Sequence, residues 1–200
     1  MGRAPNTAGL QLENAGIVLE RGFLPVNSKM ETPVAGIYAA GDCNGKLMLA
    51  HAAMAMGEVA AENALGGSSE FLPEYSPSCA YVGPEFAGVG LTEEQAAQRG
   101  LAYDVGRFPI SANGKSLVTG FTDGMIKVLT GKPYGEILGV HILAPRATDL
   151  IEEAALAIRM ECTADELIST IHCHPTVAEA LREGVMASVN RAIHMPNKKK

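Results

Sequence analysis

The sequence has little of what marks membrane-bound, secreted or nucleic-acid-binding proteins. Its 200 residues contain no apolar run long enough to span a bilayer, and its first residues carry no apolar core of a signal peptide. Lysine and arginine number 16 against 22 aspartates and glutamates, and the resulting net charge of -6 argues against a nucleic-acid partner, which usually requires a basic face. A cytoplasmic, reducing compartment is therefore the default expectation.

Cysteine is scarce and dispersed. The four cysteines are Cys43, Cys79, Cys162 and Cys173, and no two of them have the C-x-x-C spacing of a redox pair or a zinc site. The simplest interpretation is that each is a small buried thiol. We therefore predict no metal site.

One change of composition divides the chain. The run Gly66-Gly67-Ser68-Ser69-Glu70, followed by Pro73 and Pro77, has the composition of a linker. We expect a first body at residues 1–66, a linker at 67–77 and a second body at 78–200.

The first body holds only part of an α/β unit. The apolar run 36–40, which ends at Gly41-Asp42, predicts a short buried strand. The alanine-rich run 50–65 predicts a helix with Gly66 at its C′ position. One strand and one helix are half of an α/β unit, so we expect the remnant of a larger α/β domain.

The second body has the signals of a complete domain. Strands are predicted at 102–109, 117–121, 124–130 and 135–143, with glycines between them where turns are needed. Helices are predicted after the capping box of Thr92 and Gln95, at 148–161, after the capping box of Thr163 and Glu166, and at 177–193. Strands followed by a run of helices indicate an α+β domain, an antiparallel sheet with helices on one face.

The most informative stretch is the run from His172 to Glu179. Pro175 disfavours a helical conformation at His174, so this histidine is displayed at a loop–helix junction. With Thr176 as the N-cap, Glu179 is the third helical residue and its carboxylate points back towards His174. Histidine titrates near neutrality and a neighbouring carboxylate sets its tautomer, which suits a general acid/base pair.

Two other interpretations of this stretch remain open from the residues alone. Thr176-x-x-Glu179 is also a plain capping box, in which the glutamate only satisfies a backbone donor. His172 and His174 could chelate a metal, although no third and fourth ligand stand at a usable spacing. The sequence offers no nucleophile near the pair, so any thiol or hydroxyl that it serves must come from elsewhere.

The predicted strand and helix of the first body offer a second candidate site. Asp42 would present a carboxylate at the carboxyl edge of a sheet, where α/β proteins bind ligands, although Gly-Asp also begins many turns. Met48, Leu49, Ala50 and His51 open the predicted helix, whose free backbone donors and dipole suit an electron-rich ligand atom. His51 could equally be a surface residue, and Met48 and Leu49 could be core residues.

Five motifs occur in the order of one known family. They are Gly2-Arg3-Ala4-Pro5-Asn6-Thr7, Thr32-Pro33 with Gly36-Ile37-Tyr38-Ala39-Ala40-Gly41-Asp42, Met48-Leu49-Ala50-His51, Gly88-Val89-Gly90-Leu91-Thr92-Glu93, and His174-Pro175-Thr176 with Glu179. Together they resemble the second half of a pyridine nucleotide-disulphide oxidoreductase, and the resemblance covers essentially the whole chain. Met-Leu-Ala-His after Gly-Asp is similar to the members that oxidise dihydrolipoamide, rather than to glutathione or mercuric reductases.

The resemblance implies FAD and NAD as cofactors, and it implies that residues 1–66 are a partial FAD-binding domain. It implies that Asp42 binds the ribityl–pyrophosphate part of FAD and that residues 48–51 lie along the isoalloxazine. By the same resemblance, Gly2 borders the nicotinamide-nucleotide domain.

The resemblance also implies the reaction and the partners. Dihydrolipoamide is oxidised by NAD through an enzyme disulfide and FAD, with His174 as the base and Glu179 orienting it. The histidine serves the flavin and disulfide of the partner subunit, so a homodimer through residues 78–200 is obligatory. A lipoyl-bearing protein or a small disulfide is the expected substrate partner.

The chain departs from the family pattern in what it lacks. It contains no G-x-G-x-x-G fingerprint, no C-x4-C redox disulfide and little of an NAD domain. We therefore expect a segment cut from a longer enzyme, rather than one component of a split enzyme, that does not turn over by itself and holds FAD weakly or not at all. A family member acting on another disulfide or a metal ion, and a dimerising module without chemistry, remain as alternatives.

Overall fold

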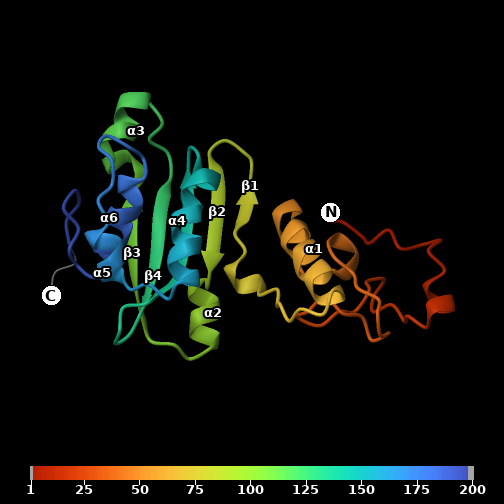
Figure 1. The fold of residues 1–200 in the computed structure, drawn as a ribbon. Coiled ribbons are helices and arrows are strands. Elements are labelled where there is room, and N and C mark those ends of the chain that lie inside the picture. The colour runs from red at the N-terminus through yellow and green to blue at the C-terminus, as the bar shows by residue number, and fades with distance from the viewer. Residues whose placement is uncertain (1, 198–200) are drawn as a thin grey trace. The chain divides into compact units, whose positions relative to one another are not determined.

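The computed structural model describes residues 2–197, which form two compact units divided between Pro73 and Glu74 (Figure 1). None of the helices in the described part of the chain is long and apolar enough to cross a membrane.

The second unit is built on a five-stranded antiparallel sheet with the strand order β1-β2-β5-β4-β3. The strands are β1 (Ser78–Ala80), β2 (Glu85–Gly90), β3 (Tyr103–Pro109), β4 (Met125–Gly131) and β5 (Ile137–Ala144). The helices are α2 (Glu93–Gln98), α3 (Gly114–Thr119), α4 (Ala147–Arg159), α5 (Ala164–Ser169) and α6 (Glu179–Ser188). Figure 1 shows α4 and α6 in front of the sheet. The predicted α+β architecture is therefore confirmed.

The core of this unit lies between the sheet and its helices. Alternation along the strands directs Ile126 and Val128 of β4, and Val140 and Ile142 of β5, into the core, where all four are fully buried. Helix α4 buries Ala147, Ile151, Ala154 and Ala157, whose spacings of four, three and three residues place them on one helical face. Helix α6 is buried along almost its whole length.

Three local predictions for this unit are confirmed. Helix α2 begins with the capping box of Thr92 and Gln95, and α5 begins with the capping box of Thr163 and Glu166. Strands β3, β4 and β5 lie within two residues of their predicted ranges. The alternation of apolar and polar residues within each of these strands was enough to predict it.

Other predictions are wrong. Residues 117–121 were expected to form a strand, but Leu117 and Val118 are exposed residues of α3, which Asn113 caps and which Gly120 ends with a φ of 76°. Strands β1 and β2 were missed because β2 contains two glycines, which weaken a strand pattern. Gly88 of β2 allows a close approach, since a Cβ there would lie 2.9 Å from the His141 ring.

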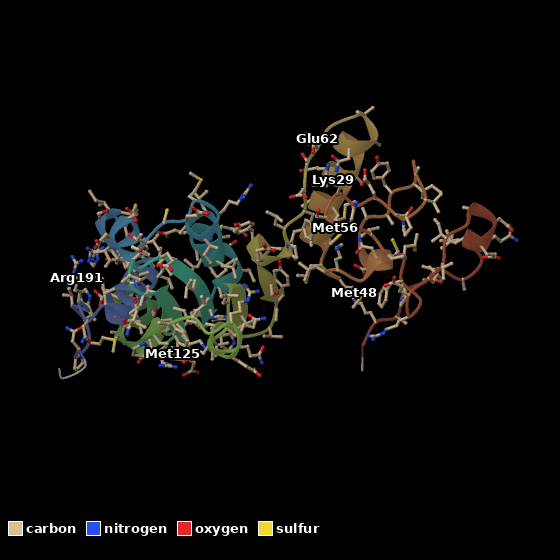
Figure 2. The ribbon with its side chains drawn as sticks, turned by 90° about the horizontal axis from the view of Figure 1, so that it is seen from below. Lys29, Met48, Met56, Glu62, Met125 and Arg191 are labelled. Carbon is tan, nitrogen blue, oxygen red and sulfur yellow. The ribbon has the colours of Figure 1, made fainter. Side chains whose placement is uncertain are left out.

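In the first unit, described from residue 2 to residue 73, the one α-helix is α1 (Ala50–Ala64). It ends as predicted before Gly66, which has the left-handed conformation with a φ of 91°. Met56 of α1, labelled in Figure 2, is fully buried together with Ala52 and Met30. The short 3-10 helices η1 (Leu12–Ala15) and η2 (Asp42–Asn44) precede α1, and η3 (Pro73–Tyr75) follows it.

The strand predicted at 36–40 is wrong. Tyr38 makes only an isolated bridge with Glu31, and residues 2–73 hold no regular strand. A strand is stable only when neighbouring strands satisfy its backbone groups, and this part of the chain offers it no such neighbour.

Candidate functional site

His174 and Glu179 meet at the start of α6. The Nδ1 atom of His174 lies 2.8 Å from Oε1 of Glu179, and the imidazole is 79% exposed whereas the glutamate side chain is 27% exposed. Because a carboxylate oxygen can only accept here, Nδ1 carries the proton and Nε2 is the basic nitrogen. The pair can therefore take a proton at an exposed ring nitrogen.

The same carboxylate also receives a backbone hydrogen bond, because the N–H of Thr176 donates to Oε2 of Glu179 over 2.8 Å. The capping contact and the histidine contact are thus made together, one through each carboxylate oxygen. The predicted cap geometry is wrong in detail, since α6 begins at Glu179 and not at Val177, and it ends at Ser188. Thr176 donates its hydroxyl to the carbonyl of Cys173 over 2.7 Å instead of capping the helix.

The electrostatics favour an ionised glutamate. Partial burial of Glu179 acts to raise the pKa of its carboxyl group, but hydrogen bonds from the Thr176 N–H and from His174 outweigh it, so the pKa of Glu179 is lowered. A carboxylate that stays ionised can orient the imidazole and stabilise the imidazolium that forms when Nε2 is protonated.

A second histidine–glutamate pair holds the same segment. His172 contacts Glu153 of α4 through Nε2 at 3.0 Å and the carbonyl of Thr170 through Nδ1 at 3.0 Å. The hydrogen bond with Glu153 raises the pKa of His172, and partial burial opposes this. Both ring contacts are to acceptors, so only the protonated ring satisfies both.

The histidines do not converge on a metal. His172 and His174 each pair with a separate glutamate, and residues 2–197 contain no group of three or more histidine, cysteine, aspartate or glutamate side chains that could hold a metal ion. All four cysteines are free, Cys173 is exposed and the others are half-buried, so the prediction that each is buried is wrong.

The sequence interpretation missed Asn113. Its Nδ2 donates to the carbonyl of Thr176 over 3.0 Å, across 63 residues of sequence, and its Oδ1 caps α3. The only signal in the sequence is Asn113-x-x-Ser116, an N-cap pattern that suggests a helix start and nothing about the distant histidine.

The candidate cofactor residues of the first unit lie around η2 and the start of α1. Asp42 begins η2 after Gly41, which has a φ of 83°, and Arg3, the neighbour of the exposed Gly2, lies 3.6 Å from the Asp42 carboxylate. The carboxylate is about half exposed, with 49% of its side chain accessible.

Helix α1 begins with the other four candidates. Leu49 is the N-cap residue, Ala50 and His51 form the first turn, and exposed Met48 precedes them (Figure 2). Leu49 has no polar side chain to accept from the first N–H groups of the helix. This uncapped start, with an accessible carboxylate in the same unit, fits a ligand that combines hydroxyl groups with an electron-rich ring or an anion.

Comparison with known protein families matches both units. The model of the pyridine nucleotide-disulphide oxidoreductase dimerisation domain matches residues 76–185, and that of the pyridine nucleotide-disulphide oxidoreductase domain matches residues 1–57.

The relatives and solved structures agree with these matches. Dihydrolipoyl dehydrogenase from Thermus scotoductus is 48% identical over 99% of this chain and 43% of its own length, and a dihydrolipoyl dehydrogenase from Bacillus subtilis is 43% identical over 97% and 41%. The crystal structure of LpdA from Mycobacterium tuberculosis has a TM-score of 0.87 and 32% identity over 92% of this chain and 41% of LpdA. The HOCl-induced flavoprotein disulfide reductase RclA from Escherichia coli has a TM-score of 0.83 and 28% identity over 92% and 43%.

The chain thus spans less than half the length of these relatives. Its matched dimerisation domain alone covers more than half of its 200 residues. The chain belongs to the pyridine nucleotide-disulphide oxidoreductase family.

Proposed function

We propose that the chain is the carboxyl-terminal part of a dihydrolipoyl dehydrogenase, which oxidises dihydrolipoamide with NAD through a redox disulfide and FAD. Relatives of that name are 40 to 48% identical over nearly the whole chain. The observation that carries the proposal is the exposed His174 imidazole, held 2.8 Å from the carboxylate of Glu179.

The role of this pair is proton transfer. Nε2 of His174 takes the proton from a thiol of dihydrolipoamide, and the thiolate that results is the competent nucleophile towards a disulfide. Glu179 holds the proton-bearing Nδ1 and stabilises the imidazolium until the proton leaves. In this proposal, the disulfide that the thiolate attacks is not formed by the cysteines of this chain and belongs to the rest of the enzyme.

The first unit holds part of the cofactor site in this proposal. Asp42 accepts hydrogen bonds from hydroxyl groups of FAD, and residues 48–51 present the N–H groups and dipole of α1 to the flavin ring. Gly2 lies at the border with the nicotinamide-nucleotide domain. The bound FAD would supply the two-electron redox chemistry between the enzyme disulfide and NAD.

The second unit supplies the dimer. We infer that residues 78–200 associate with a second copy, because the dimerisation-domain model matches residues 76–185, and that the exposed His174 acts in the active site of that copy, as the family resemblance implies. A lipoyl-bearing protein is the substrate partner in this proposal, and the free cysteines suit a reducing compartment such as the cytoplasm.

The test is reduction of NAD by dihydrolipoamide, measured with the full-length enzyme. Loss of a general base costs about 10²-fold to 10⁴-fold, so His174→Ala should lower kcat by at least about 10²-fold. His194→Ala is the matched control, because His194 is also exposed and also paired with a glutamate, at 2.9 Å from Glu183.

The outcomes separate the alternatives. Turnover only with another disulfide would keep the family and replace the substrate. Turnover that His174→Ala leaves unchanged would contradict the proposed base and favour a dimerising module without chemistry in this segment.

A further inference from the structure

Asn113 uses both ends of a buried amide. Asn113 is only 5% exposed. Oδ1 accepts hydrogen bonds from the backbone N–H and the hydroxyl of Ser116, each over 2.9 Å, while Nδ2 donates to the carbonyl of Thr176 over 3.0 Å. The amide therefore links the start of α3 to the segment that carries His174.

Few side chains could replace this amide. Aspartate and serine can accept at the N-cap of α3, but an ionised aspartate cannot donate and a serine is too short to reach the same carbonyl. A cap alone is satisfied equally well by asparagine, aspartate or serine. The donor end of Asn113 is thus a separate feature, which a role restricted to capping α3 does not need.

The contacts continue from Thr176 to the histidine. Thr176 accepts from Asn113 through its carbonyl and donates its N–H to Oε2 of Glu179 over 2.8 Å. Oε1 of Glu179 lies 2.8 Å from Nδ1 of His174. Because Thr176 is fixed from one side by Asn113 and from the other by Glu179, a shift of Thr176 displaces the carboxylate that orients the imidazole.

We propose that Asn113 is a positioning residue for the His174–Glu179 pair. Its side-chain hydrogen bonds go to Thr176 and Ser116, and it acts by holding the Thr176 backbone where Glu179 can bind both Thr176 and His174. The expected effect on kcat rests on the proposed function. The expected effect on the tautomer of His174 does not depend on it.

Asn113→Asp is the main variant, studied in the full-length enzyme at about pH 8, where an aspartate is ionised. It keeps the acceptor at the start of α3 and replaces the donor with an oxygen that faces the Thr176 carbonyl. Misplacement of a catalytic group by about 1 Å can cost about 10²-fold in rate, so kcat for dihydrolipoamide should fall by about 10-fold to 10²-fold. The KM for NAD should stay within about twofold, since the proposed role of Asn113 concerns only the His174–Glu179 pair.

Two controls separate positioning from loss of folded enzyme. NADH-dependent reduction of ferricyanide draws electrons from the flavin without proton transfer by His174, so its rate should stay within about twofold of wild type. Ser116→Ala removes one of the two bonds to Oδ1 of Asn113 and leaves its donor in place, so it should retain nearly full kcat. Asn113→Ser, which also keeps an acceptor and loses the donor, serves if the aspartate variant does not fold.

A readout independent of turnover is the ¹⁵N spectrum of His174, assigned with His174→Gln. The wild type should show the Nδ1–H tautomer, and Asn113→Asp should show a mixture of tautomers. The proposal would be overturned if Asn113→Asp and Asn113→Ser both kept the wild-type kcat. It would also be overturned if Ser116→Ala lowered kcat as much as they do. If the wild-type enzyme does not oxidise dihydrolipoamide, the proposed function fails, and an unchanged tautomer in Asn113→Asp would then refute the positioning role separately.

Discussion

Gly106 of β3 sets how closely α6 lies on the sheet. A Cβ atom added at Gly106 would overlap the carbonyl oxygen of Gly184 and would lie 2.5 Å from the backbone nitrogen of Ser188. Both atoms belong to the α6 backbone and cannot rotate away as a side chain would. Gly106→Ala therefore requires α6 to move, and α6 begins at Glu179.

The size of the effect follows from these distances. Non-bonded carbon atoms pack best at about 3.5 to 4.0 Å, so α6 has to retreat from β3 by roughly 1 Å. Overpacking a core costs about 1 to 3 kcal/mol, and sometimes more. We expect Gly106→Ala to lower the free energy of unfolding by about 3 kcal/mol, because the clash involves backbone and most of α6 is buried.

Gly184→Ala is the matched comparison on the other side of the same contact. Its added Cβ would lie 3.1 Å from a methyl group of Ile126 and 3.3 Å from one of Val128. Such contacts can relax by a few tenths of an ångström, and alanine gains about 1 kcal/mol over glycine within a helix. We expect a net loss of stability of about 0 to 2 kcal/mol for this variant.

Urea denaturation followed by circular dichroism measures both variants, with the slope of the transition checked for constancy. The expected order is wild type, Gly184→Ala and then Gly106→Ala, in decreasing stability. A Gly106→Ala variant as stable as Gly184→Ala would show that α6 does not lie on β3 as closely as the structure has it.

Two further predictions concern the neighbouring helices. The raised pKa of His172, caused first by its hydrogen bond with Glu153, means that the folded state binds the proton more tightly than the unfolded state. This stabilisation is complete below the unfolded pKa of about 6.5 and is lost as pH rises through the folded pKa. The stability advantage of wild type over Glu153→Gln should therefore be largest near pH 6 and shrink by pH 9 in thermal unfolding, whereas a constant difference would contradict the ionic pairing. Thr163→Ala removes the capping box that Thr163 forms with Glu166 and should cost about 1 kcal/mol in the same assay, while Thr163→Ser should cost almost nothing.

Local signals account for the elements that the sequence predicted correctly. Helix α4 has an apolar face at helical spacing, and α5 has a side-chain cap at its start. Strands β4 and β5 alternate buried core residues with less buried residues over 125–128 and 140–144. In each case the residues that specify the element lie within it, so no partner has to be known.

Non-local contacts account for the failures. Residues 36–40 have a strand composition but find no neighbouring strand in the described structure, so only the bridge of Tyr38 with Glu31 forms. Strand β2 carries two glycines and forms because β1 and β5 pair with its two edges. Residues 117–119 show the reverse, since they include β-branched Val118 and Thr119 but belong to α3, which Asn113 caps.

The candidate site divides in the same way. The sequence by itself determined that His174 and Glu179 lie within reach of each other, because they are five residues apart across a turn into a helix, and the structure shows the contact. Only the tertiary structure decided what holds them there. Asn113 lies 63 residues from Thr176, and Glu153 lies 19 residues from His172. These partners come together because α3, α4 and α6 belong to one folded unit, in which α4 and α6 pack on the same sheet, and no local pattern in the chain specifies that meeting.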